Sequence, residues 1–222
     1  MPGPRHDFAP RSLAVVLLAL FALAAAARIG WGGEPARASG WVAVSDPDAT
    51  YHLRRAERIG ADFPTLAIFD PFLNAPLGAV VPWPPLWDLT LAAALRLAPS
   101  DPASGFVRPA VALLPPLVAA LGVLAVFALA RRLFSGHLEL AAGAAGFAAL
   151  VAADRPWTGF GRLDHSAAEL AFWGAIAAAL ARALDRAPRP GALDRRALLP
   201  ALALAAGLAT QAALLPAAEC KP

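Results

Sequence analysis

The sequence has 222 residues, of which 59% are hydrophobic and 16% charged, with a formal net charge of +3. Soluble domains are typically less apolar and more charged, so this composition excludes an ordinary soluble domain and indicates a membrane protein. The net positive charge resides in arginines of short links between apolar segments, and therefore does not indicate nucleic-acid binding. The single cysteine, Cys220, excludes an intrachain disulfide and a cysteine-based zinc site.

Apolar segments of about the length of a bilayer core predict an all-α fold, a polytopic membrane bundle of about five transmembrane helices. We expect these spans over residues 12–30, 107–131, 138–154, 166–184 and 197–216. The first segment also fits a cleaved signal peptide, because arginines precede it and small residues end it. An uncleaved membrane anchor is the favoured interpretation.

The arginines between the apolar segments predict the topology. Arg131 and Arg132 follow one expected span, and a further basic run lies between 182 and 196. Because basic links tend to remain in the cytoplasm, we expect a cytoplasmic N-terminus and two outer loops, residues 31–106 and 155–165. Both loops would then share one compartment.

The first outer loop is expected to contain short helices and to open with an amphipathic one. Its apolar residues recur at helical spacing: Ala49, His52, Leu53, Ala56 and Ile59. We expect this helix to lie along the membrane surface. The next segment carries six prolines between 64 and 85, which predicts an extended loop rather than a span. Its aromatic side chains indicate anchoring at the membrane interface or, alternatively, docking of a lipid-linked ligand.

Acidic residues occur in both outer loops, at Asp46 and Asp48 in the first and at Asp154 and Asp164 in the second. Carboxylates from two loops on one side of a membrane can converge on a divalent cation, for which two or three oxygen ligands and water suffice. A carboxylate near a helix start is also favoured by the helix dipole alone, so a purely structural role stays open.

The segment "GRLDHSAAE" adds an imidazole, His165, next to Asp164. Ser166 and Glu169 have the spacing of a capping box, which predicts that Ser166 is the N-cap of the following helix. Asp164 and His165 would then stand just outside that helix, at the edge of the membrane. Ionisable residues in such a position are costly enough to indicate function.

The stretches "DPDATYHLRRAERI", "FDPFLNAPLG" and "WPPLWD", followed by "GRLDHSAAE", resemble the catalytic subunit of oligosaccharyltransferase in its bacterial and archaeal forms. The resemblance covers about residues 40 to 175 and implies the N-terminal portion of a C-type glycosyltransferase. Such enzymes transfer an oligosaccharide from a polyprenyl-phosphate-type carrier to an asparagine of an acceptor protein. It further implies a multi-pass protein of the inner (plasma) membrane, in contact with membrane lipids, with a periplasmic or extracellular active face.

The resemblance also assigns roles to residues. It implies that Asp48 and Asp164 are catalytic and, with His165, hold Mn²⁺ or Mg²⁺. His52 and His165 would contact the substrate, the lipid-linked oligosaccharide. Arg162 or Arg155 would bind the phosphate of the carrier, since a planar guanidinium suits phosphate oxygens.

Three departures from the family follow from the same comparison. Ser166 stands where the family has a further metal ligand, and Thr50 and Ala75 stand where aromatic residues are usual. The C-terminal outer domain that reads the acceptor sequence is absent, and the final "AAECKP" is typical of a truncated gene product. Two alternatives therefore stay open: a C-type glycosyltransferase acting on lipid or glycan, and a non-catalytic remnant or membrane subunit.

Overall fold

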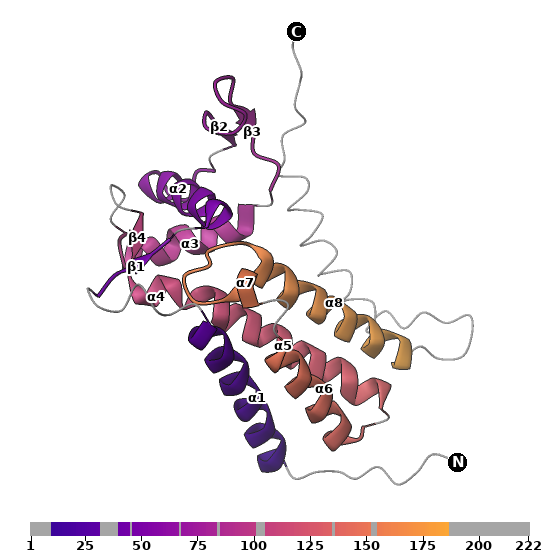
Figure 1. Ribbon diagram of the computed structural model, residues 1–222. Helices are drawn as coiled ribbons and strands as arrows, with labels where there is room; N and C mark the ends of the chain where they lie inside the picture. The colour runs from indigo at the N-terminus through magenta and orange to yellow at the C-terminus, as the bar shows by residue number, and fades with distance from the viewer. Residues whose placement is uncertain are drawn as a thin grey trace.

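The computed structural model describes residues 10–31, 40–44, 46–66, 68–83, 85–100, 105–134, 136–151 and 155–186. Most of these residues are helical, in agreement with the predicted fold class, and four two-residue strands accompany the helices. The helices fall into two groups, one above the other in Figure 1.

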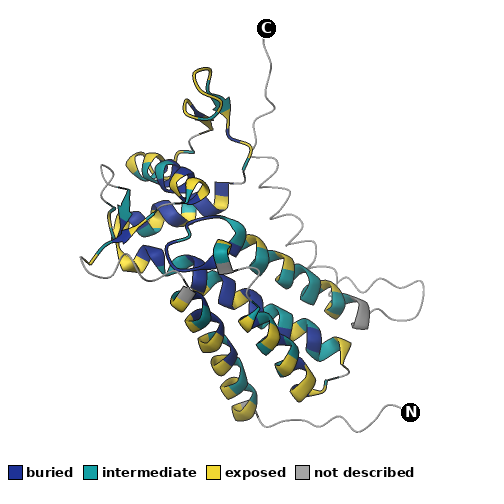
Figure 2. Cartoon of the chain, viewed as in Figure 1, coloured by how far each residue is buried: buried dark blue, intermediate teal, exposed yellow. Residues whose placement is uncertain are grey.

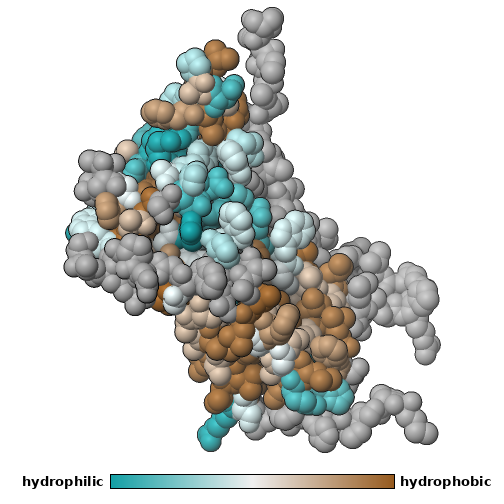
Figure 3. Space-filling model, in the orientation of Figure 1, coloured by the Kyte–Doolittle hydropathy of each residue, from teal (hydrophilic) through white to brown (hydrophobic). Residues whose placement is uncertain are grey.

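The lower group is a bundle of α1 (Pro10–Trp31), α5 (Leu114–Leu133), α6 (Leu138–Leu150) and α8 (Ser166–Arg186). Helix α5 packs against each of the other three. A core of alanine, leucine, valine and phenylalanine side chains joins α1, α5 and α6. The outward-facing residues of the bundle are also apolar and form the brown surface in the lower half of Figure 3, as expected of helices in contact with lipid.

Two helices in the described part of the chain are long and apolar enough to cross a membrane: Arg11–Gly30 within α1, and Pro109–Leu133, which combines α4 (Pro109–Ala112) with α5. Helix α6 has 13 residues, about 20 Å of helix, which is shorter than the roughly 30 Å core of a bilayer. Helix α8 carries charged residues at both ends and is not a third such helix. A bundle of five spans stays a prediction, and its last member, 197–216, lies outside the described residues.

The upper group is built from the predicted first outer loop. It contains α2 (Pro47–Ala61), α3 (Pro85–Leu97) and two antiparallel strand pairs, β1 (Val42–Ala43) with β4 (Phe106–Val107) and β2 (Phe69–Asp70) with β3 (Ala79–Val80). The registers pair Val42 with Val107 and Phe69 with Val80. The short helix α7 (Arg155–Thr158) belongs to the second predicted outer loop and packs on α1, α5 and α8.

The apolar face of α2 is covered by α3, and the position of this helix along the membrane surface stays a prediction. The residues that share this face, which are buried in a core with α3, are Ala49, His52, Leu53, Ala56 and Ile59. Figure 2 shows this buried face of α2 turned toward α3. Helical periodicity identified the face correctly, but periodicity does not tell whether lipid or protein covers it.

The proline-rich segment is only partly extended. Residues 69–80 form the β2–β3 hairpin, whose turn needs positive φ angles at Asn74 and Gly78. The last of the six prolines, Pro85, does not belong to an extended loop, because α3 begins there. Proline suits this first helical position, where its missing N–H costs no hydrogen bond and its φ is already helical.

Candidate metal centre

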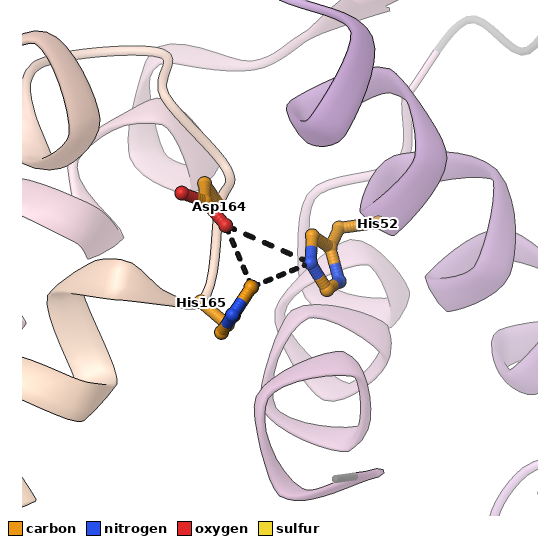
Figure 4. Close-up of side chains that lie close together, drawn as sticks. All are labelled: His52, Asp164 and His165. Atoms are coloured by element: carbon orange, nitrogen blue, oxygen red, sulfur yellow. Dashed lines mark hydrogen bonds and ion pairs between the residues drawn. The ribbon is translucent and has the colours of Figure 1, made fainter. Parts of the chain in front are cut away.

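Three side chains from the two predicted outer loops converge between α2 and the start of α8: His52, Asp164 and His165. One ligand atom from each lies within 4.8 Å of the others. His52 Nε2 is 3.0 Å from His165 Nδ1 and 3.8 Å from Asp164 Oδ1, and His165 Nδ1 is 2.7 Å from Asp164 Oδ1. Figure 4 shows the three groups facing one another across the gap between the two segments.

Asp164 is buried, with 5% of its surface exposed, yet its Oδ1 atom has no hydrogen bond of good geometry. Burial alone would raise the pKa of this carboxyl. Contacts with His165 and Ser166, together with the nearby charges of His165 and His52, outweigh burial and lower the pKa of Asp164 to about 2. The pKa of His165 is raised, chiefly by its contact with Asp164 and against the opposing effect of burial. The carboxylate therefore stays ionised, and its Oδ1 faces the two imidazoles inside the cluster.

His52 is held from behind by α3. Its Nδ1 lies 2.6 Å from Oδ1 of Asp88, which is fully buried, and the second oxygen of Asp88 accepts a hydrogen bond from Arg55 at 2.5 Å. The side chain of Arg55 is itself 4% exposed. Because ring nitrogen Nδ1 is engaged by Asp88, the other nitrogen, Nε2, is the one that faces Asp164 and His165.

The segment that carries Asp164 is fixed by backbone contacts on both sides. The indole N–H of Trp87 donates to the carbonyl of Leu163 at 2.7 Å. The N–H of Gly161 donates to the carbonyl of Ala112 at 3.0 Å, and its φ of +78° selects glycine. These contacts join α3, α4 and the second loop into one body, so the position of Asp164 depends on all three.

Arg28 anchors the same segment from α1. It is fully buried, and its guanidinium donates to Thr158 Oγ1 at 3.1 Å and to the carbonyls of Ala24 and Ala149. Its own carbonyl accepts from the N–H of Phe160. A buried arginine at the end of an apolar helix satisfies the carbonyls and hydroxyl around it, and here it ties α1 and α6 to the loop below the candidate site.

The prediction that Ser166 is an N-cap is wrong. Helix α8 begins at Ser166, and the N–H of Glu169 donates to the carbonyl of His165. The hydroxyl of Ser166 donates instead to Asp164 Oδ2 at 2.6 Å. A serine two residues after an aspartate can cap the helix or hold the aspartate, and the short spacing "DHS" does not distinguish these roles. The hydrogen bond leaves Oδ1 as the oxygen of Asp164 that faces the two histidines.

Of the other predicted residues, Asp48 lies exposed in the first turn of α2, one turn before His52, and is not one of the three clustered side chains. Asp46, not Asp48, reaches the second loop: its Oδ2 accepts from Arg162 at 2.9 Å, while its Oδ1 caps α2. Arg155 begins α7, and its side chain lies outside the described part of the structure, as does Asp154.

Sequence reasoning missed the residues that support the cluster, namely Asp88, Arg55 and Arg28. The available signal was the charge itself: Asp88 follows a tryptophan within "WPPLWD", and Arg28 ends an apolar helix. Charged residues in such surroundings are seldom fully buried unless they are paired. Which partner each residue finds could not be read from the sequence.

The cluster fits a divalent cation. Ligand atoms about 2.1 Å from one ion lie roughly 3.0–3.4 Å apart, and the three separations observed bracket that range. Oδ1 of Asp164, which is buried beside both imidazoles and lacks a hydrogen bond of good geometry, is the acceptor that such an ion would satisfy. Two imidazoles and one carboxylate are a donor set of transition-metal sites, including Zn²⁺, and suit Mg²⁺ least because Mg²⁺ prefers oxygen ligands.

The fold and the cluster together define a largely helical protein with apolar helices long enough to cross a membrane and a group of side chains that could hold a metal ion at the junction of two loops. Neither a scan against protein-family models nor a search of curated proteins found a match. A search of solved structures found the oligosaccharyltransferase of Archaeoglobus fulgidus in several forms. The resemblance predicted from the sequence is confirmed at the level of the fold.

The similarity to the apo form has a TM-score of 0.74 at 19% sequence identity and covers 92% of this chain and 24% of that one. The form tethered to an acceptor peptide with an NVT sequon gives 0.73 at 22% identity, covering 94% and 24%. A complex with Zn and sulfate gives 0.69 at 20% identity, covering 90% and 24%. The chain thus spans about a quarter of the length of these structures, consistent with an N-terminal portion.

Proposed function

We propose that this chain is part of a membrane glycosyltransferase of the oligosaccharyltransferase type. It would transfer a glycan from a polyprenyl-phosphate-type carrier to an asparagine of an acceptor protein. The convergence of His52, Asp164 and His165 in a fold shared with an oligosaccharyltransferase is the observation that carries this proposal. Further support comes from related structures, which include complexes with an acceptor peptide and with a dolichol-phosphate.

In this proposal His52 Nε2, Asp164 Oδ1 and His165 Nδ1 hold the cation. We infer Zn²⁺ or Mn²⁺ in preference to Mg²⁺, because two of the three donors are imidazole nitrogens. The Zn complex of the related structure is in line with this choice. A bound divalent cation supplies Lewis-acid polarisation and a template for the reacting groups.

Asp48 is proposed as a carboxylate of the same site that faces the asparagine of the acceptor protein. It stands four residues before His52 in α2, so both side chains project from the same side of the helix. The Asp46–Arg162 bond draws the start of α2 toward the second loop and hence toward Asp164. From this position Asp48 would accept a hydrogen bond from the asparagine amide or complete the ligand set.

Arg162 is proposed to bind the phosphate of the carrier. Its guanidinium is part-exposed and is engaged by Asp46 at one nitrogen, which orients it while leaving other N–H groups for phosphate oxygens. Arg155 is the second arginine proposed for this role. Both belong to the segment next to Asp164, so the carrier phosphate would lie beside the cation.

The proposed orientation places the site outside the inner (plasma) membrane. Both loops that build it lie at the same end of the bundle in the structure (Figure 1). The basic pair Arg131–Arg132 lies at the opposite end of α5 from Leu114, which packs against the core of the upper group. Under the positive-inside rule, that arrangement gives a cytoplasmic basic end and a periplasmic or extracellular site.

The proposal is tested by binding measurements on the purified chain in lipid nanodiscs. We expect one Zn²⁺ or Mn²⁺ per chain, and we expect Asp164→Asn to lose at least about tenfold in metal affinity, since it removes the one carboxylate among the three clustered side chains. A short-chain polyprenyl phosphate is then titrated with and without metal, and tighter binding with metal is expected. Absence of metal binding by the wild-type chain would overturn the proposal.

Acceptor specificity is tested separately, with lipid-linked oligosaccharide and two peptides. One peptide contains Asn-Val-Thr, and the other has Gln in place of that Asn and is otherwise identical. Transfer to the asparagine peptide alone, detected by mass spectrometry, is expected of an oligosaccharyltransferase. Transfer to a lipid or free glycan with neither peptide modified would instead identify another C-type glycosyltransferase.

A further inference from the structure

Behind the candidate metal centre lies a buried carboxylate that the chemistry above does not use. Asp88 is fully buried in the first turn of α3, and each of its oxygens has one partner. Oδ1 is 2.6 Å from His52 Nδ1, and Oδ2 accepts from Arg55. Asp88 thus joins the first turn of α3 to two side chains of α2, His52 and Arg55.

This arrangement decides which nitrogen of His52 carries the proton. Arg55 can only donate hydrogen bonds, so Oδ2 of Asp88 accepts from it. Oδ1 of the same carboxylate is the acceptor for His52 Nδ1. Nδ1 therefore bears hydrogen, and neutral His52 presents the lone pair of Nε2. That nitrogen is the one 3.0 Å from His165 Nδ1, on the side of the candidate centre.

The residue before Asp88 acts on the other half of the centre. Trp87 is buried and donates its indole N–H to the carbonyl of Leu163, the residue directly before Asp164. Two successive residues at the start of α3 thus hold the two segments that carry the proposed ligands. Asp88 bonds the side chain of His52, and Trp87 bonds the backbone next to Asp164. The distance between His52 and Asp164 depends on this single turn of helix.

We propose that the Trp87–Asp88 pair is the positioning element of the metal centre: Asp88 fixes the tautomer and direction of His52, and Trp87 fixes the segment that carries Asp164. The inference rests on the proposed function, since it takes the three clustered side chains as metal ligands. Carboxylates hydrogen-bonded to metal-binding histidines commonly set ring orientation, and their loss costs about 10- to 100-fold in metal affinity.

The experiment compares Asp88→Asn with a matched control, Asp70→Asn, in the purified chain in nanodiscs. Asp70 is also buried and also bonded to an arginine of α2, Arg54, but its other oxygen accepts from the backbone of Phe72. Both variants remove one buried carboxylate charge that is hydrogen-bonded to an arginine of α2, and Asp70 also lies 3.8 Å from a second arginine, Arg58. Only Asp88→Asn removes a partner of His52.

In Asp88→Asn the amide oxygen must face Arg55, so the amide NH₂ faces His52 Nδ1 and drives the ring proton to Nε2. We expect Zn²⁺ affinity to fall about 10- to 100-fold in this variant and less than about threefold in Asp70→Asn. The sequence has four histidines, so nitrogen-15 histidine labelling can follow His52 directly. Its signature should change from the Nδ1–H to the Nε2–H tautomer in the metal-free Asp88→Asn variant alone.

Trp87→Phe is the second variant, because it keeps the ring and removes only the N–H donor. We expect an affinity loss of about fivefold, the worth of one neutral hydrogen bond, without a change of tautomer at His52. The control is Asp164→Asn, which must still weaken metal binding. With that control in place, equal Zn²⁺ affinities in Asp88→Asn and wild type, or an unchanged His52 signature, would overturn the inference. Failure of the wild-type chain itself to bind metal would overturn both this inference and the proposed function.

Discussion

Helix α2 carries two adjacent arginines, and each pairs with a buried aspartate from a different region. Arg54 bonds Asp70 in the β2–β3 hairpin at 2.7 Å, and Arg55 bonds Asp88 in α3 at 2.5 Å. The arginine of the first pair is 34% exposed in its side chain, and that of the second 4%. Both regions thus contain an arginine–aspartate pair, but the arginine is partly exposed to solvent in the hairpin pair and buried in the α3 pair.

The second oxygen of each aspartate shows what the difference means. Asp70 uses it to accept the N–H of Phe72 and so shapes the hairpin turn, whereas Asp88 uses it to hold His52. A deeply buried ion pair contributes little net stability, because desolvating two charges offsets their attraction. Orientation of the His52 imidazole therefore explains the Arg55–Asp88 pair better than stability does.

The largest difference between the regions is expected when each aspartate is removed outright. Asp88→Ala leaves Arg55 buried and unpaired, which should lower the free energy of unfolding by about 3–5 kcal/mol. Asp70→Ala should cost about 1–3 kcal/mol, because Arg54 can turn toward water. Thermal unfolding of both variants in detergent provides the comparison. Equal losses would show that the two pairs are energetically alike.

Asp164 is a third buried aspartate, and its partners are Ser166 and His165 in place of an arginine. Ser166→Ala removes a hydrogen bond to a charged group and should lower stability by about 1.5–3 kcal/mol. We expect only a few-fold change in Mn²⁺ affinity, followed by paramagnetic resonance. A loss of affinity as large as that of Asp164→Asn would make Ser166 a ligand.

Gly78→Ala tests whether the hairpin is independent of the site. The φ of Gly78 is +73°, and an added Cβ would lie 2.3 Å from the ring of Phe69. The left-handed backbone alone should cost about 1–2 kcal/mol, and Phe69 must also move. Faster proteolysis between β2 and β3 with unchanged Zn²⁺ affinity is the expected result. A parallel loss of Zn²⁺ affinity would contradict the separation of the two regions.

Acid should loosen the hairpin through Asp70. Although burial opposes it, the hydrogen bonds from Arg54 and Phe72 lower the pKa of Asp70 in the folded chain. Its stabilisation is therefore complete above the unfolded pKa near 4 and is lost as the pH falls through the lower folded value. Pepsin cleavage near Phe72 should rise with acid in the wild-type chain, and Asp70→Asn should cleave fast throughout. Equal rates in both proteins at pH 4–5 would contradict this.

The smallest effect is expected from the contact of Arg54 with Phe72, whose ring centre lies 4.7 Å from the guanidinium carbon. Phe72 is 66% exposed, so Phe72→Leu should lower stability by only about 0.5–1 kcal/mol. Chemical denaturation of this variant and of Arg54→Lys, which keeps the charge, checks the value. A loss beyond about 2 kcal/mol would mean that Phe72 has a further role.

The sequence by itself determined the helical class, the first apolar helix and the apolar face of α2. It also identified Asp164 and His165, because an acid and an imidazole beside an apolar helix are costly and stand out locally. These features depend on composition and on periodicity along the chain, which a single sequence displays directly.

Tertiary structure alone decided the partners. His52 belonged to a helical face, and only the packing of α2 on α3 turned it between Asp88 and His165. That Asp48 and Asp164 share a cation stays a prediction, and the bond between the start of α2 and the second loop is made by Asp46, which caps α2 and accepts from Arg162. Hydrogen-bond partners 36 to 116 residues apart are set by how helices pack, and no local pattern of residues records that choice.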